Sequence, residues 1–406
     1  MENKQQNILC TRSNTQQGFT LVEFMVASVL GLVVIAGAGS LYSYTKRLND
    51  VGMARVATLQ DLRVASTMIG QDARSAGVFG CASLGRRYAP DTTDAEIHIH
   101  QPTMPEGTKL DTLDNATTPA AGVRWVDDST VVKNIINSGN PTSGNNKDFT
   151  PKGGALLFYY GEGSLAYKSG DSTSSKVTFS TSEGHPNKIV ENVFTTGGYL
   201  VAAGCNALQL EKVNKVSSKP SSYTVTLDSS IVNTKNDSYT SSSTLSTMPA
   251  YADMILQRYK VVAYVVGEVK GEPDSLYRFE FGNNGDQWSA PQQVAKNVNS
   301  MTAEFLFVTE CKTGVLGAGV TDADNTHKFY WRTPTATEVK NGAAISDPVS
   351  SGTVVQGPSA VHLTLNYDFP KVRGGGVESG PAGQNFEIVA VVRGGNVCAS
   401  RKLSQQ

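Results

Sequence analysis

Charged residues, cysteine and histidine are all scarce in this chain of 406 residues. Charged side chains make up 17% of the sequence, against roughly a quarter in ordinary globular proteins, and the formal net charge is −1. A chain this close to neutral is not expected to have a basic surface for nucleic acid, so no nucleic-acid partner is predicted. Hydrophobic residues make up 39% of the chain, which permits a large buried core and argues against disorder of the whole chain.

Familiar catalytic and cofactor-binding motifs are also missing from the sequence. It contains no G-x-S-x-G, no H-E-x-x-H, no phosphate-binding loop and no dinucleotide fingerprint. His98 and His100 would share one face of a strand, but no third ligand accompanies them, so a polar face is expected rather than a metal site. Residues 322–325 lack the glycine and the distant glutamate of a calcium loop. We therefore expect neither an enzyme nor a resident metal or cofactor.

One long uncharged run is present, and it lies near the N-terminus. From Phe24 to Thr45 there are 22 residues without a charge, and as a helix this run would be about 33 Å long, enough to cross a bilayer. Two simple interpretations are a secretory signal cut near residues 36–38 and an ordinary membrane anchor. Neither has a use for Glu23, because a carboxylate in a bilayer costs on the order of a few kcal/mol and usually marks a function.

The segment Gly18-Phe19-Thr20-Leu21-Val22-Glu23, with the apolar run behind it, resembles the class III signal of type IV prepilins and pseudopilins. In that family a membrane peptidase cuts after the glycine and methylates the new N-terminal phenylalanine. The resemblance therefore implies a cytoplasmic leader of residues 1–18, cleavage between Gly18 and Phe19, and N-methylation of Phe19. Glu23 falls at the fifth mature position, as in the family. The leader is longer than usual, and no later Met before Phe19 could shorten it.

Two roles remain open for Glu23. Cleavage would create an ammonium on Phe19 in an apolar layer, and a buried ammonium and a buried carboxylate are tolerable only as a pair. Glu23 of one subunit would then neutralise Phe19 of another, which is the assembly contact that the resemblance implies. Alternatively, Glu23 caps the N-terminus of its own helix, where the helix dipole favours an anion.

The helix is expected to continue beyond the membrane segment, from about residue 20 to residue 75. Residues 19–45 would form the part in the membrane or filament core, and residues 46–80 an amphipathic continuation that packs on a sheet. Three glycines in the first part, each costing up to about 1 kcal/mol relative to Ala, would allow either unwinding or close helix packing. Charged residues, Asp72 among them, are expected on the other faces. The predicted apolar stripe consists of Leu41, Leu48, Val51, Leu59, Leu62, Ile69 and Ala73.

The pattern R-x-A-G-x-x-G-C, from Arg74 to Cys81, resembles the end of the helix in PilW-type minor pilins. The resemblance covers about residues 17–82. It implies a single-pass inner-membrane protein with a periplasmic head, which meets the prepilin peptidase, the assembly platform, other minor pilins and the major pilin. It would initiate pilus assembly and end near the pilus tip at the cell surface.

Two alternatives to that role stay open. One is a minor pseudopilin of a type II secretion system, which shares the N-terminal signal. The other is a tip adhesin with a ligand site in its head. Exposed aromatic residues would be candidates for such a site, although core packing is expected for each of the three tryptophans, Trp125, Trp288 and Trp331.

Residues 81–406 are expected to form a large, loop-rich antiparallel β head, so the fold class is α+β with a long N-terminal helix. Stretches rich in Ser, Thr, Gly and Asn, at 135–153, 168–175, 215–247 and 333–358, are expected to be loops. Residues 261–266 and 276–281 are expected to pair as a hairpin. The runs with strand character are 155–160, 176–180, 199–203, 222–227, 255–266, 276–281, 302–308, 328–331, 361–367 and 386–392.

The size of this head favours a minor subunit. As one compact body of about 326 residues it would have a radius of gyration near 20 Å. Subunits in a pilus shaft are closely stacked, so heads of this size would clash laterally if every subunit carried one.

Cysteines point to disulfides rather than to a metal. Loss of the leader removes Cys10 and leaves four cysteines in a translocated domain, where the environment is oxidising. A four-thiolate zinc site is disfavoured because the chain has no C-x-x-C pair. Four cysteines allow three pairings. We prefer Cys81–Cys205 and Cys311–Cys398, since each joins neighbouring parts of the sequence.

Overall fold

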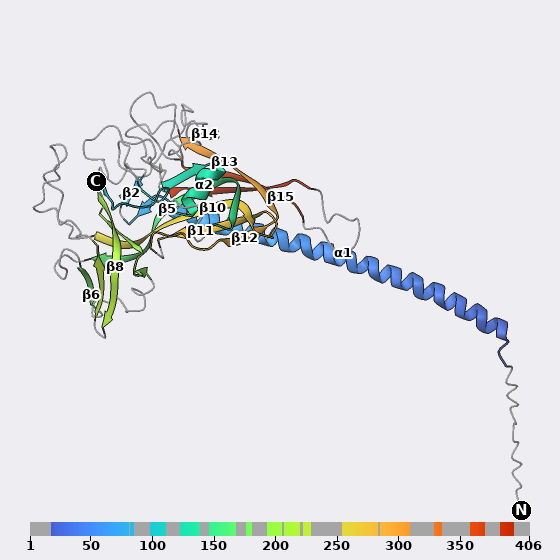
Figure 1. The fold of residues 1–406 in the computed structure, drawn as a ribbon. Coiled ribbons are helices and arrows are strands. Elements are labelled where there is room, and N and C mark those ends of the chain that lie inside the picture. Colours follow the sequence, from blue (N-terminus) through green and yellow to red (C-terminus); the bar gives the residue numbers. More distant parts are fainter. Residues whose placement is uncertain are drawn as a thin grey trace, which may run out of the picture.

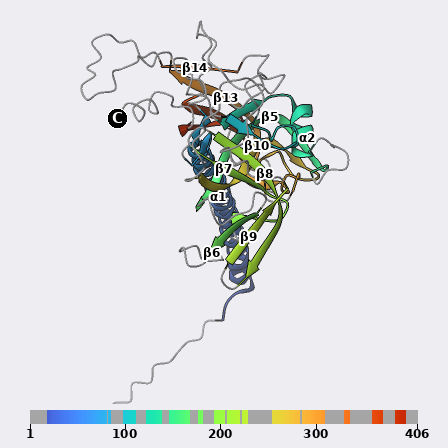
Figure 2. The same cartoon turned by 90° about the vertical axis from the view of Figure 1, so that its left-hand side faces the viewer.

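The computed structural model of the chain consists of one long helix and a β-rich head, the α+β fold predicted from the sequence (Figure 1). The helix projects from the head over its first part and lies along the head at its other end (Figures 1 and 2). The structure describes residues 18–80, 82–84, 98–110, 122–138, 146–167, 176–180, 193–204, 207–219, 222–228, 254–282, 285–308, 329–334, 358–369 and 382–393.

Helix α1 (Leu21–Ser75) is continuous over 55 residues, which corresponds to about 80 Å. Its side chains are mostly exposed up to residue 57, and burial begins at Thr58. The predicted apolar stripe is therefore buried only in its second half. Ile69 lies in the core, whereas Leu41 and Leu48 are exposed because the described part of the head does not extend that far along the helix.

Ten strands form the larger sheet, and β10 (Met254–Val269) is its central strand. Strand β5 (Phe149–Tyr167) pairs with β10 along almost its whole length, while β11 (Ser275–Phe281) and β7 (Tyr199–Ala203) pair along the opposite edge. The other strands are β12 (Gln292–Lys296) beside β11, β4 (Val123–Val126) beside β5, β8 (Ala207–Lys219) beside β7, β9 (Ser222–Leu227) beside β8, β6 (Lys176–Ser180) beside β9, and β3 (His98–His100) beside β8.

A second, four-stranded antiparallel sheet packs face to face with part of the larger one. Its order is β14 (Phe329–Arg332), β13 (Val298–Val308), β15 (Ala360–Tyr367) and β16 (Gln384–Val391). Helix α1 lies against β12 and β16, one edge strand of each sheet. It thus covers two strand edges that would otherwise be open to pairing with other chains.

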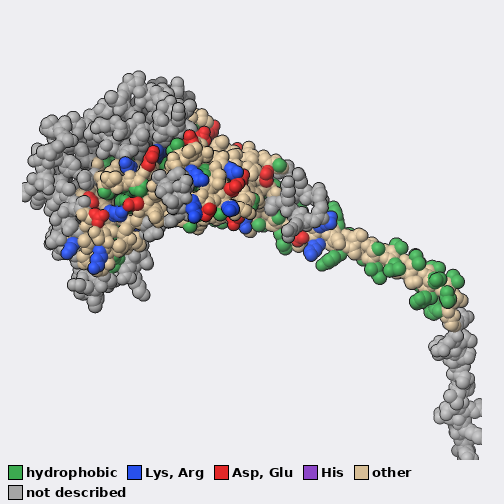
Figure 3. All heavy atoms as spheres, viewed as in Figure 1, with side chains coloured by type: hydrophobic (Ala, Val, Ile, Leu, Met, Phe, Trp, Pro, Cys, Tyr) green, Lys and Arg blue, Asp and Glu red, His purple; other side chains and the backbone are tan. Residues whose placement is uncertain are grey.

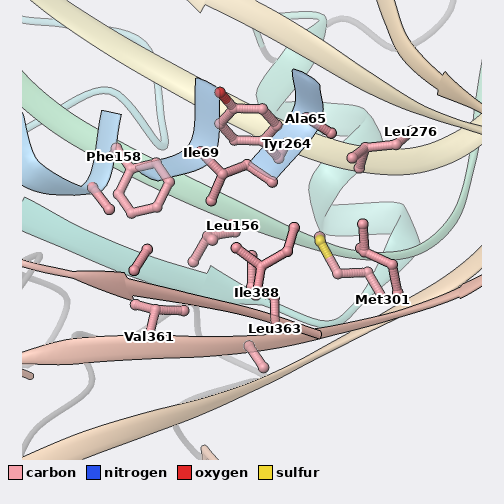
Figure 4. Close-up of a cluster of buried hydrophobic side chains, with 14 of the residues drawn as sticks. Ala65, Ile69, Leu156, Phe158, Tyr264, Leu276, Met301, Val361, Leu363 and Ile388 are labelled. Atoms are coloured by element: carbon pink, nitrogen blue, oxygen red, sulfur yellow. The ribbon is translucent and has the colours of Figure 1, made fainter. Parts of the chain in front are cut away.

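The core shared by α1 and the two sheets is drawn in Figure 4. Ile69 of α1, Leu156 of β5 and Leu363 of β15 converge there, and each is fully buried. Full burial of such a side chain contributes about 1.5–3 kcal/mol, so this core is what attaches the helix to the head.

A second core covers the other face of the larger sheet. Helix α2 (Ser129–Ile136), capped by Asp128, contributes Val132 and Ile135 to it. Because the larger sheet is buried on both faces, its central strand is apolar without alternation, as in the run Val-Val-Ala-Tyr-Val-Val at 261–266.

Most strand predictions are confirmed. The ten predicted runs all coincide with strands, and the predicted hairpin is present as β10 and β11, with Val266 opposite Leu276. The loop predictions at 135–153 and 215–247 are wrong in part. The first range overlaps the end of α2 and the start of β5, and the second overlaps the end of β8 and all of β9. Strand β8 was missed, since polar residues such as Lys212 and Lys215 interrupt its apolar pattern.

Two further features depart from the expectations. Helix α2 lies between β4 and β5, in a segment for which no helix was predicted. The sheet is antiparallel except that β3 pairs with β8 in parallel. His98 and His100 lie in strand β3, and a strand is one of the two settings, strand or loop, expected for them.

Candidate functional site

The N-terminal signal leads directly into the first turn of α1. Thr20 is the N-cap, and its hydroxyl oxygen accepts a hydrogen bond from the Glu23 backbone N–H at 3.3 Å. The Glu23 carboxylate in turn accepts from the Thr20 backbone N–H at 3.1 Å and from the Thr20 hydroxyl at 2.9 Å. This reciprocal arrangement is a capping box, which satisfies two backbone donors at the start of a helix.

The capping role considered for Glu23 is therefore present in the single subunit. Both bonds from Thr20 go to one carboxylate oxygen, Oε2. Within the described residues, Oε1 accepts no hydrogen bond. Phe19 is exposed beside this cap. The geometry thus leaves one oxygen of Glu23 available to another molecule without loss of the cap.

Glycine at position 18 is not required by the folded chain. A Cβ placed there meets no atom within 4 Å, and the same is true at Gly31, Gly37 and Gly39. Their backbone conformations are also accessible to other residues, because none has a positive φ. Within the described residues, neither space nor backbone conformation therefore requires glycine at these four positions.

The first part of α1 is apolar around its circumference and exposed. Among the described residues it is the one helix long and apolar enough to cross a membrane, judged by length and composition. Figure 3 shows hydrophobic side chains along the projecting helix and mixed charges on the visible part of the head. The exposed side chains include Leu21, Val22, Phe24, Met25, Val29, Leu30, Leu32, Val33, Val34 and Ile35.

Asp72 joins α1 to the larger sheet through a buried polar cluster. Its carboxylate accepts hydrogen bonds from the Tyr160 hydroxyl at 2.7 Å and the Tyr264 hydroxyl at 2.6 Å, and from Arg278 Nε at 3.1 Å. We call Asp72, Tyr160, Tyr264 and Arg278 the Asp72 cluster. Asp72 is only 7% exposed, so the prediction that it lies on another face of the helix is wrong.

Burial and neighbouring charges shift the pKa of the two tyrosines and of the arginine in the Asp72 cluster. Burial, followed by the Asp72 charge and the hydrogen bond to it, raises the pKa of Tyr160 and of Tyr264. Burial, the largest single cause, lowers the pKa of Arg278, but the charge of Asp72, its hydrogen bond and the charges of Tyr264 and Glu280 together raise it above the ordinary value, so the guanidinium stays charged. Removal of one partner of a buried ion pair costs about 3–5 kcal/mol, because the other charge is left uncompensated.

Alternating charges continue from Arg278 along the same face of the sheet. Arg278 is paired with Glu280, and Lys260 Nζ lies 3.2 Å from Glu280 and 3.4 Å from Glu162, which is also paired with Arg258. Burial raises the pKa of Glu280, but the charges of Lys260 and Arg278 lower it by more, to below its ordinary value. Together with Asp72 of the helix, the set contains three cations and three anions, so its formal charges cancel. The cations are Arg258, Lys260 and Arg278, and the anions are Asp72, Glu162 and Glu280.

Glycines fix the turn that follows α1. Gly77 and Gly80 have φ angles of 74° and 55°, a region that suits glycine. The Gly77 N–H donates to the Tyr159 carbonyl at 2.8 Å, and a side chain at Gly122 would overlap the backbone of both residues. A Cβ at Gly80 would come within 3.1 Å of Ile255 Cβ. The glycines of the R-x-A-G-x-x-G-C pattern are thus required by the fold, unlike Gly18.

The remaining predicted site residues divide in two groups. Trp125 and Trp288 are buried, 4% and 2% exposed, as predicted, but Trp331 is 43% exposed, so its predicted core packing is wrong. All five cysteines and the segment 322–325 lie outside the described residues. No cluster of three or more metal-ligating side chains occurs in the described part of the chain.

Comparison with known proteins gives one match. The family model described as the prokaryotic N-terminal methylation motif matches residues 13–39, which include Gly18, Phe19, Glu23 and the first part of α1. No curated protein and no solved structure matches the chain.

Proposed function

We propose that this chain is a minor pilin of a type IV pilus, of the PilW type, which helps to initiate assembly and sits near the pilus tip. The methylation motif supports a type IV pilin-like or pseudopilin-like protein, a structural class rather than an enzymatic one. Together with the apolar helix it supports membrane anchoring followed by incorporation into a pilus. The observation that carries the proposal is the motif at the start of a helix whose apolar side chains are exposed.

The finer role rests on the head and on the turn after α1. A head of about 326 residues, with a radius of gyration near 20 Å, is too bulky for every subunit of a closely stacked shaft. The glycine turn at Gly77 and Gly80, which the fold requires, is the segment that resembles PilW-type pilins. Both observations favour a minor subunit over a shaft subunit.

Processing is proposed at the bond between Gly18 and Phe19, by the prepilin peptidase, followed by methylation of the Phe19 amine. The absence of any steric need for glycine at position 18 supports recognition by another protein. Glu23 would have two successive roles. It caps α1 in the membrane-anchored subunit, and in the pilus its second oxygen meets the Phe19 ammonium of a neighbouring subunit.

Two disulfides are proposed, Cys81–Cys205 and Cys311–Cys398. For the first, Gly80, which precedes Cys81, lies beside Ile255, and Ala203, two residues before Cys205, is the cross-strand partner of Ile255, so the chain approaches both cysteines from the same region. Non-reducing peptide mapping tests both bridges, and free thiols at these positions would refute them.

The second bridge is supported by the ends of β13 and β16. These strands run in parallel on either side of β15 and end together, about 10 Å apart, before residues 311 and 398. The same peptide map should therefore contain one peptide pair from each bridge.

The intact mass and N-terminal sequence of the membrane-extracted protein test the proposal first. A chain that begins at methylated Phe19 is expected, and a chain that begins at Met1 or after Ala38 would contradict it. Deletion of the gene then separates two filament systems. Loss of surface pili with normal protein secretion supports the minor pilin, whereas loss of secretion with normal pili indicates a pseudopilin of a type II secretion system.

A further inference from the structure

Beyond α1, the described head has three large hydrophobic side chains that are exposed, and all three lie on one sheet. They are Trp331, 43% exposed, Val389, 64% exposed, and Val391, 55% exposed. Trp331 belongs to β14, and the two valines belong to β16, at the opposite edge of the four-stranded sheet. Scattered single apolar residues are normal on a surface, but a set confined to one face marks an interaction site.

Strand register places these side chains on the same face. Trp331 is opposite Leu306, Leu306 is opposite Ala360, and Ala360 is opposite Val391, so one apolar row crosses all four strands. With inter-strand spacings of about 4.8 Å, the row is about 14 Å long. Val389 lies on the same face, two residues from Val391. We call the exposed Trp331, Val389 and Val391, together with the partly exposed Leu306 and the buried Ala360 between them, the apolar patch, and this side of the sheet the outer face.

Acidic side chains border the apolar patch. His362 Nδ1 lies 3.1 Å from Glu304 Oε2, and His362 Nε2 lies 3.7 Å from Glu387 Oε2. The edge of the Trp331 ring meets the His362 ring, with 5.7 Å between ring centroids. The outward positions of the four paired strands contain no Lys or Arg. The outer face is therefore apolar at one end and acidic beside it.

We infer that the outer face docks another pilus subunit, of different sequence, through a surface that presents apolar side chains flanked by Lys or Arg. This inference rests on the proposed role in a pilus. An exposed tryptophan and exposed valines on one sheet face, with polar side chains beside them, match the apolar centre and polar rim of a protein interface. A second copy whose two-fold axis passes near Glu304 and Glu387 is disfavoured, because it would bring these carboxylates against their own copies, and like charges disfavour a contact.

Photo-crosslinking in cells tests the occupant directly. p-Benzoylphenylalanine replaces Val389 in the full-length chain, and as a matched control it replaces Asn385, which is exposed on the same strand and face but away from the apolar patch. A cross-linked product with another pilin, identified by mass spectrometry and at least about fivefold stronger at 389 than at 385, is expected from the high local contact of a hot spot. Equal yields, a product with a second copy, a glycan product alone, or no product would overturn the inference.

Substitutions measure the contribution of the patch to assembly. Trp331→Ala and the double variant V389T/V391T should each lower the amount of this subunit in sheared pili about tenfold, the effect of losing a hot-spot residue. Thr is used because it favours strands as Val does. Asn385→Ala is the control and should leave the amount unchanged. Normal amounts of Trp331→Ala and V389T/V391T in pili would overturn the inference.

Charge reversal separates docking from folding. Glu387→Lys changes an exposed side chain and should reduce incorporation, while the amount of processed subunit in the membrane stays normal. An acidic substitution at the basic residue of the cross-linked partner should restore incorporation, and failure of such rescue would overturn the charge match. If the wild-type chain has no methylated Phe19 and is missing from pili, the proposed function fails as well. If it is processed and present in pili, only the docking inference is at stake.

Discussion

Helix α1 has two stretches that differ in the burial of their apolar side chains. Residues 58–75 bury Leu62, Ala65 and Ile69 against both sheets of the head, and Asp72 is held by three side chains of the larger sheet. Residues 21–57 leave their apolar side chains exposed in the single subunit. Since exposed apolar surface costs about 25 cal/mol per Å², the first stretch needs a bilayer or other helices around it.

The difference shows that one helix serves two separate structural roles. Changes in residues 58–75 should affect the stability of the subunit, whereas changes in residues 21–57 should affect its association with membrane and pilus. Glycines reflect the same division. Those at 31, 37 and 39 have open space around them, while Gly77 and Gly80 just beyond the helix are required by the turn.

Asp72→Ala should have the largest effect on the free energy of unfolding. It leaves the buried Arg278 charge without its main partner, which costs about 3–5 kcal/mol. Urea unfolding of the detergent-solubilised subunit, followed by tryptophan fluorescence, measures the change. Asp50→Ala is the matched control on the exposed stretch, with an expected change within about 0.5 kcal/mol. Similar losses in the two variants would contradict the division of the helix.

Ile69→Ala should come next. Removal of this fully buried side chain leaves a cavity between the helix and the two sheets and costs about 2–5 kcal/mol. Leu41→Ala, on the exposed stretch, should leave the urea midpoint of the subunit unchanged and instead reduce its amount in sheared pili. A shifted midpoint for Leu41→Ala would mean that the first stretch also contributes to the folded head.

Acid should lower the free energy of unfolding by protonating Glu280, which pairs with Lys260 and with Arg278 of the Asp72 cluster. The pKa of Glu280 is lowered in the folded state, so the stability it contributes is present above its unfolded pKa of about 4.3 and is lost as the pH falls through the lower folded value. The free energy of unfolding should therefore fall below about pH 4.3. Glu280→Gln should be less stable at neutral pH and have a shallower decline in acid, as measured by urea unfolding at a series of pH values. An unchanged acid slope would exclude Glu280 as a source of the decline.

Substitutions in the capping box should have the smallest effect on the head. Thr20→Ala removes a cap worth about 1 kcal/mol at a helix end that can fray independently. Glu23→Ala removes both the cap and the proposed partner of the Phe19 ammonium. Neither should change the urea midpoint of the head or cleavage after Gly18, but only Glu23→Ala should sharply reduce the number of pili. If Thr20→Ala reduces pili equally, capping alone explains the role of Glu23.

Periodicity and composition were sufficient for the framework of the fold. The uncharged run and the apolar stripe predicted one helix from about residue 20 to 75, and it is observed at Leu21–Ser75. Alternating and apolar runs predicted most strands, since these patterns follow from which faces are buried. Strand β8 and helix α2 were both missed. Polar residues interrupt the apolar pattern of β8, and α2, although it has a capping Asp128 and apolar Val132, Ile135 and Ile136, is only eight residues long, too short to establish a helical period.

Side-chain environments could not be predicted in the same way. On a helical wheel Asp72 looks like a surface residue. It is buried because side chains of the larger sheet bind it, and these lie 88, 192 and 206 positions further along the sequence. Trp331 looks like a core residue, but it is 43% exposed, on the face that it shares with the exposed Val389. Such side-chain contacts join segments that are far apart in the sequence, and no local sequence pattern shows which segments will meet.

The sequence by itself determined the N-terminal motif, the length of the helix and the α+β class, because each depends on the chemistry of neighbouring residues. Only the tertiary structure decided where the helix becomes buried, which charges the Asp72 cluster brings together, and which sheet face stays apolar and exposed. Those outcomes depend on how strands that are distant in the sequence pair with one another. A shift of the pairing register by one residue would move every side chain of a strand to the other face of the sheet.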